Sequence, residues 1–362
     1  MKAAVCRGFG EPLVIEDVFL DPPGKGQIQV RLAACAICHS DISAAAGAWG
    51  GTLPAVYGHE ASGVVEAVGE GVEGFAEGEK VLVTLIRSCG HCPACDAGAL
   101  TSCDDAWHVP PSPLRSAVGE PVVQGINCGA FAENVVVDQS QCIGLPDDIP
   151  LDVASLLACG VITGYGAVMN TAKIQPGQSV AVVGAGGVGL NCIQGAVIAG
   201  ARSVIAVDLT PEKLDTAASY GATAGVLAGE EAHKAVKEAN GGRGVDAVFV
   251  SVGSAAAIGA AVRFLAPGGS VIVVGMPPTG SDVAFDAGIL AALNHKIVGA
   301  RMGETVLKRD IPILLEHYRS GALKLDELIS GRFPLEAINT AIASTRSGIA
   351  GRNVIVFDDV SP

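Results

Sequence analysis

Four cysteines lie close together in the chain: Cys89, Cys92, Cys95 and Cys103. Four thiolates at this spacing can close a tetrahedral shell around zinc and leave no position open for substrate, so the pattern predicts a structural zinc lobe at about 86–106. His91 lies inside the cluster but is surplus, because four sulfurs already fill the shell. The alternatives are four unrelated thiols in a loop, or a zinc lobe that grips nucleic acid. The formal net charge of −14 and the lack of a basic stretch oppose the second alternative.

A second set of metal-binding residue types is dispersed along the chain: Cys38, His59 followed by Glu60, and Cys159. Two thiolates and one imidazole would leave the fourth position of zinc open for substrate, which is the arrangement of a catalytic site. The other interpretation is two buried core cysteines and a hydrogen-bonded histidine. Spacing alone favours that interpretation.

The stretch 180–208 carries a dinucleotide-binding pattern. A short apolar run precedes Gly184, Gly186 and Gly189, and apolar residues at helical spacing, a second apolar run and Asp208 follow. Such glycines permit the tight turn, the approach of a pyrophosphate and the packing of helix on strand, and the helix N-terminus favours the phosphates. Asp208 can accept hydrogen bonds from the adenosine ribose and would repel a 2′-phosphate. The pattern predicts NAD rather than NADP, the alternative being a glycine turn that only packs a helix on a sheet.

These residues need elements to position them, and the rhythm of the chain changes near Ser179. Before it, short β-type runs at 28–32, 63–67, 80–84 and 133–137 lie between glycine and proline turns, which predicts a mostly antiparallel domain. After it, expected strands at 180–183, 204–207, 245–250, 270–274 and 296–300 alternate with helical segments, which predicts an α/β fold with a doubly wound parallel sheet. The closing apolar run at 353–357 reads as a strand. A single strand needs a sheet to join, so we expect the chain to return to the first domain.

Composition limits the function classes. A chain of 362 residues with 49% hydrophobic and 17% charged residues can bury a large core, and two domains are expected. The acidic balance argues against nucleic acid and against an anionic membrane surface. The uncharged segments 153–172 and 174–201 are broken by glycine and polar residues and suit a buried core better than a membrane span. Without an export signal at the start, the eleven cysteines indicate metal ligands in a reducing cytoplasm.

Five motifs occur in the order and approximate spacing of the zinc-dependent alcohol dehydrogenases, the zinc branch of the medium-chain dehydrogenase/reductase family, which the sequence resembles from end to end. They are the segments 37–41, 58–60, the four-cysteine lobe, 159–166 and 184–208. The resemblance implies a GroES-like catalytic domain at 1–160 and 302–362 and a Rossmann NAD-binding domain at 161–301. It also implies two zinc ions per chain, one catalytic and one structural. The implied reaction is reversible hydride transfer between an alcohol and NAD⁺, giving aldehyde or ketone and NADH.

The resemblance also implies roles for single residues. Cys38, His59 and Cys159 would hold the catalytic zinc, with Glu60 a carboxylate able to approach it. Asp41 would orient the ligand histidine, as outer-shell acids do, and Ser40 would accept the proton of the alcohol. The implied cofactor contacts are the glycine turn with Gly187 and Val188, Asp208 and Lys213 at the ribose, His39 and Arg352 at the pyrophosphate, and Val274.

The sequence departs from family patterns at two places. Ser43 stands where many members carry a histidine that ends the proton relay, so the proton must leave through water or another group. Trp49 and Trp107 stand where the branch that oxidises the glutathione adduct of formaldehyde has an acid and an arginine, which argues against glutathione specificity. Trp49 and Leu85 are instead expected to line an apolar substrate pocket, with ordinary core packing as the alternative.

Other functions stay open from the sequence. A metal-free reductase of the same superfamily would lack the cysteine ligands. The sequence does not exclude a dehydrogenase of another formaldehyde–thiol adduct. The intact ligand set argues against a non-catalytic nucleotide-binding protein with this fold. The long segment between Cys103 and Phe131 resembles the dimeric branches, so a homodimer is expected, with a tetramer as the alternative.

Overall fold

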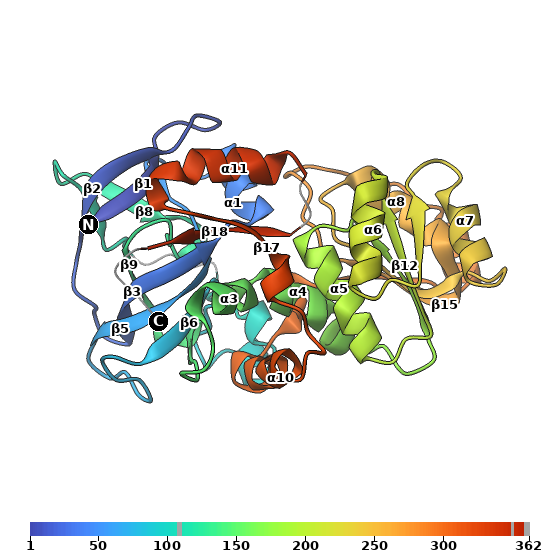
Figure 1. Ribbon diagram of the computed structural model, residues 1–362, viewed down its shortest axis with the longest axis horizontal. Coiled ribbons are helices and arrows are strands. Elements are labelled where there is room, and N and C mark those ends of the chain that lie inside the picture. The colour runs from blue at the N-terminus through green and yellow to red at the C-terminus, as the bar shows by residue number, and fades with distance from the viewer. Residues whose placement is uncertain (107–110, 349–350, 358–362) are drawn as a thin grey trace. The chain divides into compact units, whose positions relative to one another are not determined.

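The computed structural model describes residues 1–106, 111–348 and 351–357, and the chain forms two compact units (Figure 1). The first comprises Met1–Gly160, Val306–Lys308 and Leu325–Pro362, and the second comprises Val161–Thr305 and Arg309–Lys324. The chain therefore leaves the first unit after Gly160 and ends in it.

The first unit combines a closed barrel with a larger, mostly antiparallel sheet. The barrel order is β1 (Lys2–Cys6), β2 (Val14–Leu20), β7 (Leu114–Ser116), β8 (Pro121–Gln124) and β4 (Ala55–Val56). The sheet order is β10 (Cys142–Gly144), β6 (Lys80–Thr84), β5 (Glu60–Val68), β3 (Gln27–Ala36), β18 (Arg352–Val356) and β17 (Ile329–Phe333), with β9 (Asn134–Asp138) also paired to β3. Strand β18 pairs with β3 in antiparallel register, so the predicted return of the C-terminal strand to the first domain is confirmed.

The second unit is built on a parallel sheet. Its order is β13 (Ala224–Leu227), β12 (Ser203–Asp208), β11 (Ser179–Val183), β14 (Val245–Val250), β15 (Leu265–Val273) and β16 (Lys296–Gly299). Strands β11 and β12 are buried along their whole length, because helices cover both faces of such a sheet. Helix α5 (Gly187–Ile198) connects β11 to β12, helix α6 (Pro211–Ser219) connects β12 to β13, and Figure 1 shows both helices beside the sheet. The predicted doubly wound α/β fold is confirmed, and its strand order reverses between β11 and β14, where such folds bind ligands.

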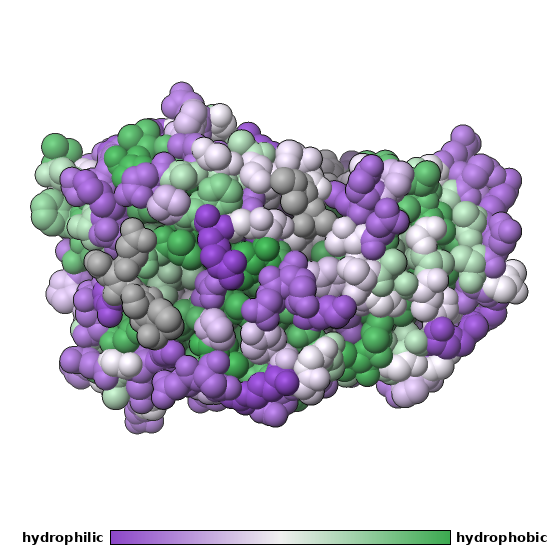
Figure 2. All heavy atoms as spheres, in the orientation of Figure 1, coloured by the Kyte–Doolittle hydropathy of each residue, from purple (hydrophilic) through white to green (hydrophobic). Residues whose placement is uncertain are grey.

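The surface of the protein carries both hydrophilic and hydrophobic residues. Figure 2 shows hydrophilic and hydrophobic residues interspersed over the visible face. Among the described residues, no single helix has the length and apolar character needed to cross a membrane. One broken pair, Leu151–Ala158 with Gly160–Ala172, passes the same test by length and composition only.

Candidate active site and structural metal centre

The catalytic candidates of the first unit begin with Asp41, which lies in the first turn of α1 (His39–Ala45). Its buried carboxylate accepts hydrogen bonds from the backbone N–H groups of Cys38 at 3.1 Å and Gly58 at 2.9 Å. The same carboxylate lies 2.8 Å from Nδ1 of His59. Gly58 has φ +92°, and a Cβ there would lie 2.6 Å from the backbone nitrogen of Phe131. Glycine is therefore required at the turn that delivers His59 to the site.

The side chains of Cys38, His59, Glu60 and Cys159 converge, as the resemblance implied. One ligand atom from each lies within 4.8 Å of all the others, and all four residues are buried. Nε2 of His59 is buried and has no hydrogen-bond partner in the described part of the chain, although buried polar atoms are normally paired. An unpaired imidazole nitrogen beside two sulfurs fits a zinc ion, which prefers this donor set.

Electrostatics at this cluster also fit a cation. A hydrogen bond from Cys159 lowers the pKa of the Cys38 thiol well below its ordinary value, and the same bond raises the pKa of Cys159. Burial disfavours charge on His59, but the Asp41 carboxylate and Cys38 outweigh it and raise the pKa of the imidazole. The protein alone therefore places negative charge on Cys38, and a bound metal ion would require both thiols as thiolates.

Arg352 is the residue whose surroundings the sequence did not indicate. The resemblance assigned it to the cofactor pyrophosphate, and in the first unit its buried guanidinium lies 3.5 Å from Oε1 of Glu60 and donates to the carbonyl of Ile37 at 3.4 Å. Burial raises the pKa of Glu60 to about 8, while the positive charge of Arg352 opposes that shift. A carboxylate this deeply buried needs a cation, but no sequence pattern identifies a partner almost three hundred positions away. The contact of Arg352 with a cofactor stays a prediction.

The four cysteines of the lobe also come together, with their ligand atoms within 4.8 Å of one another. Backbone N–H groups point at the sulfurs: Cys89 donates to Sγ of Cys103 at 3.3 Å, and Cys95 donates to Sγ of Cys92 at 3.4 Å. Backbone N–H groups of Asp104 and Cys95 lower the pKa of Cys92 to about 6, whereas desolvation raises the pKa of Cys95 to about 12. Four sulfurs with no other donor fit a closed structural zinc site.

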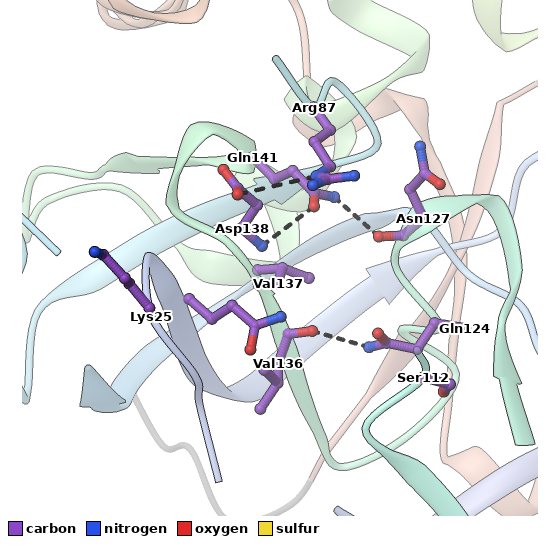
Figure 3. A pocket seen from close by; sticks show the side chains of 10 residues that line it. Lys25, Arg87, Ser112, Gln124, Asn127, Val136, Val137, Asp138 and Gln141 are labelled. Carbon is purple, nitrogen blue, oxygen red and sulfur yellow. Dashed lines mark hydrogen bonds and ion pairs between the residues drawn. The ribbon is translucent and has the colours of Figure 1, made fainter. Parts of the chain in front are cut away.

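Polar contacts attach this lobe to the rest of the first unit. Arg87 lies 3.6 Å from Asp105 of the lobe and 3.9 Å from Asp138, and Asn127 donates to the carbonyl of Ala106 at 2.9 Å. Figure 3 shows Arg87, Asn127 and Asp138 around a pocket. The pocket has a volume of about 170 Å³. None of the predicted site residues lines this pocket, so we assign it no part in the chemistry of the metal cluster.

The nucleotide-binding candidates lie in the second unit, at the carboxyl ends of β11 and β12. Gly184 has φ +95°, and a Cβ on Gly189 would lie 1.7 Å from the carbonyl oxygen of Gly184, so the turn requires both glycines. Gly186 precedes α5, whose first turn contains Gly187 and Val188. Asp208 ends β12; its carboxylate accepts the N–H of Ala185 at 2.7 Å and lies 4.0 Å from Nζ of Lys213. Val274 follows β15 and donates to the carbonyl of Val250.

The remaining predicted site residues belong to neither metal cluster and lie outside the nucleotide-binding turn. Ser40 is partly exposed in the first turn of α1, next to His39, which is exposed. Trp49 is half-buried and packs against the core of the first unit, and Leu85, directly after β6, is buried. Their role in a substrate pocket stays a prediction. Trp107 lies outside the described residues.

Comparisons with known proteins agree with this geometry. Residues 24–147 match the family described as alcohol dehydrogenase GroES-like domain, and residues 187–319 match the family described as zinc-binding dehydrogenase. The chain is 33% identical to the NDMA-dependent alcohol dehydrogenase of Amycolatopsis methanolica, over 98% of each chain. An alcohol dehydrogenase zinc-binding domain protein from Burkholderia ambifaria has a similar structure, with a TM-score of 0.94 and 35% identity over 99% of this chain and 98% of that one. Benzyl alcohol dehydrogenase from Acinetobacter calcoaceticus gives a TM-score of 0.92 at 28% identity, over 99% of each chain.

Proposed function

Because the chain belongs to the zinc-containing medium-chain alcohol dehydrogenases, we propose that it uses NAD and two zinc ions per chain to interconvert an alcohol with its aldehyde or ketone. The observation that carries the proposal is the convergence of Cys38, His59 and Cys159, with Nε2 of His59 buried and unpaired among the described residues. A metal-free reductase would have no use for this donor set. The relatives named above are alcohol dehydrogenases, so oxidation of a formaldehyde–thiol adduct is not favoured.

Each candidate residue of the first unit would have a separate role in the reaction. Zinc held by Cys38, His59 and Cys159 supplies a Lewis acid that lowers the pKa of a bound hydroxyl, as it lowers that of water from about 15.7 to about 7. Asp41 holds His59 so that Nε2 is directed away from the carboxylate. The hydroxyl of Ser40 accepts the alcohol proton, and with Ser43 in place of a relay histidine the proton leaves through water or another group. The glycine turn and Asp208 of the Rossmann unit would hold the nicotinamide cofactor, which would supply the hydride acceptor.

We assign the choice between NAD and NADP to Asp208. A charged carboxylate at the end of β12 can pair with ribose hydroxyls and would repel a 2′-phosphate. Its Oδ1 and Oδ2 accept backbone N–H groups of Leu209 and Ala185, which fix its position. These contacts support NAD over NADP.

A second candidate is a reaction that depends on NDMA. The relative from Amycolatopsis methanolica, at 33% identity over nearly the whole chain, is NDMA-dependent by name. NDMA dependence would mean that the added nicotinamide alone does not sustain turnover. Assays with and without NDMA separate the two candidates.

The enzyme is also proposed to be a cytoplasmic homodimer. Metal-binding thiolates need a reducing compartment. In the second unit, β16 is the outer strand of the sheet, and Met276, Phe285 and Ile289 are exposed close to it in sequence. An open strand edge with exposed apolar neighbours supports pairing with a second copy. Light scattering after size exclusion tests the dimer, and a monomer at all concentrations would contradict it.

A panel of primary, secondary and aromatic alcohols, benzyl alcohol included, tests the reaction itself. Each alcohol is assayed with NAD⁺ and with NADP⁺ by the appearance of the reduced cofactor, and zinc is counted per chain. We expect reduction of NAD⁺, two zinc ions per chain, and loss of activity when one of them is removed. A metal-free protein that is active would overturn the proposal.

A further inference from the structure

The hydroxyl of Thr84 makes a contact that neither the resemblance nor the metal cluster explains. Thr84 is the last residue of β6 and is fully buried. Its Oγ1 donates a hydrogen bond to the carbonyl oxygen of Ala158 at 2.5 Å. Ala158 directly precedes the metal-ligand candidate Cys159.

This hydrogen bond lies where a helix ends. The helical run α3 (Leu151–Ser155) and η4 (Leu156–Ala158) stops at Cys159, which has φ −146° and ψ −67°, outside the helical region. Carbonyl groups in the last turn of a helix lose their N–H partners and need another donor when they are buried. The hydroxyl of Thr84 supplies that donor. Because the peptide joining Ala158 to Cys159 is planar, fixing this carbonyl also fixes the direction in which the chain enters Cys159.

The other two predicted ligands already have a positioning group. Asp41 bonds the backbone of Cys38 and the ring of His59. Thr84 is placed to do the same for the third ligand, since it lies directly opposite Glu60 in the β5–β6 register. Opposed residues of an antiparallel pair project to the same face of the sheet.

The side chain of Gln141 also bonds to Thr84. Its Nε2 donates to the backbone carbonyl of Thr84 and to that of Asn127, both at 2.9 Å. Figure 3 shows Gln141 in the pocket wall, linked to Asn127 and Asp138. The end of β6 is therefore also anchored through its backbone.

We propose that Thr84 is a positioning residue for Cys159: its hydroxyl sets the direction of the third sulfur–metal bond and thereby the affinity of the catalytic metal site. The inference rests on the proposed function. It assigns Thr84 no contact with substrate, cofactor or metal.

The test is Thr84→Val, which keeps the shape of the side chain and removes the donor. Thr84→Ser restores the hydroxyl. Ser62→Ala is the matched control, because Ser62 is equally buried on the neighbouring strand β5 and its hydroxyl donates to the carbonyl of Leu151, at the other end of the same helical run. Each protein is dialysed against graded concentrations of a chelator, and zinc per chain is measured together with alkylation of Cys38 and Cys159 by peptide mass spectrometry.

We expect Thr84→Val to release the catalytic zinc, and to expose Cys159 to alkylation, at a chelator concentration about 10-fold lower than the wild type, as for other outer-shell partners. Thr84→Ser and Ser62→Ala should release it where the wild type does, even if Ser62→Ala lowers the melting temperature. Equal release by Thr84→Val and wild type would overturn the role of Thr84 alone. So would earlier release by Ser62→Ala to the same extent. A wild type that holds no chelatable zinc at Cys38 and Cys159 would overturn the proposed function as well.

Discussion

Nδ1 of His59 lies 2.8 Å from Oδ1 of Asp41, and both side chains are buried. An ionised carboxylate can only accept, so the shared proton lies on Nδ1, and a metal ion that binds Nε2 would displace the second proton of the imidazole. The carboxylate also accepts two backbone N–H groups, so it cannot turn away from the ring without losing them.

Asp41→Asn should therefore weaken the catalytic metal site. The amide keeps the shape but loses the charge that orients and polarises His59, and such changes typically cost about 10–100-fold in metal affinity or activity. Zinc counted after chelator dialysis, together with kcat, measures the effect. Asp246→Asn, which alters a carboxylate of the other unit, is the control and should retain both zinc ions. Wild-type zinc retention by Asp41→Asn would contradict the assignment.

Cys103→Ser should remove one zinc ion per chain and loosen the lobe. A hydroxyl does not replace a thiolate as a structural ligand, and structural zinc contributes directly to folding. We expect one zinc ion fewer and new proteolytic cleavage between Arg87 and Ala106, detected by mass spectrometry. Cys128→Ala changes a buried cysteine outside both clusters and should keep two zinc ions. An intact lobe without its zinc would show that the four sulfurs have another purpose.

Asp208→Asn should reduce the preference for NAD. Hydrogen bonds to charged groups are worth about 1.5–3 kcal/mol, so kcat/KM for NAD should fall by about 10–100-fold. The value for NADP should rise, because the repulsion of the 2′-phosphate is removed. Steady-state kinetics with both cofactors measure the change. A wild type that already prefers NADP would refute the role of Asp208.

Asp246→Asn should change the acid limb of stability. Burial alone would raise the pKa of Asp246, but hydrogen bonds from Ser179 and the charge of Arg243 lower it overall. A carboxyl group whose folded-state pKa is lowered stabilises the fold above its unfolded-state pKa, and that contribution is lost as the pH falls. The variant should melt at a lower temperature than the wild type at pH 7, and the difference should shrink below about pH 4. A difference that is constant from pH 7 to pH 3 would exclude this charge effect.

The sequence supports some of these expectations much better than others, for physical reasons. The parallel sheet was predictable because its strands are buried on both faces and appear as continuous apolar runs, as in β11 and β12. The four-cysteine lobe was predictable because its ligands are local. The dispersed set was not, since spacing favoured buried core cysteines for Cys38 and Cys159. Only the resemblance implied that they converge.

Contacts between side chains distant in the sequence escaped prediction altogether. Arg352 and Glu60 meet because β18 joins the sheet beside β3, which in turn pairs with β5. The bond from Thr84 to Ala158 depends on where a helix stops, which apolar periodicity does not fix to the residue. Such contacts follow from the completed fold, and no local pattern encodes them.

Ser40→Ala provides the most direct test of the chemistry in the first unit. Ser40 lies in the first turn of α1, two residues after Cys38, and is partly exposed to solvent. If its hydroxyl accepts the alcohol proton, its loss should lower kcat by at least about 100-fold, the lower end of general acid–base contributions. Zinc content and melting temperature should stay near the wild type, because neither Asp41 nor the sulfur ligands are changed. Unchanged turnover in Ser40→Ala would remove Ser40 from the mechanism, and a fall in melting temperature or zinc content would point to damage to α1 instead of a lost proton acceptor.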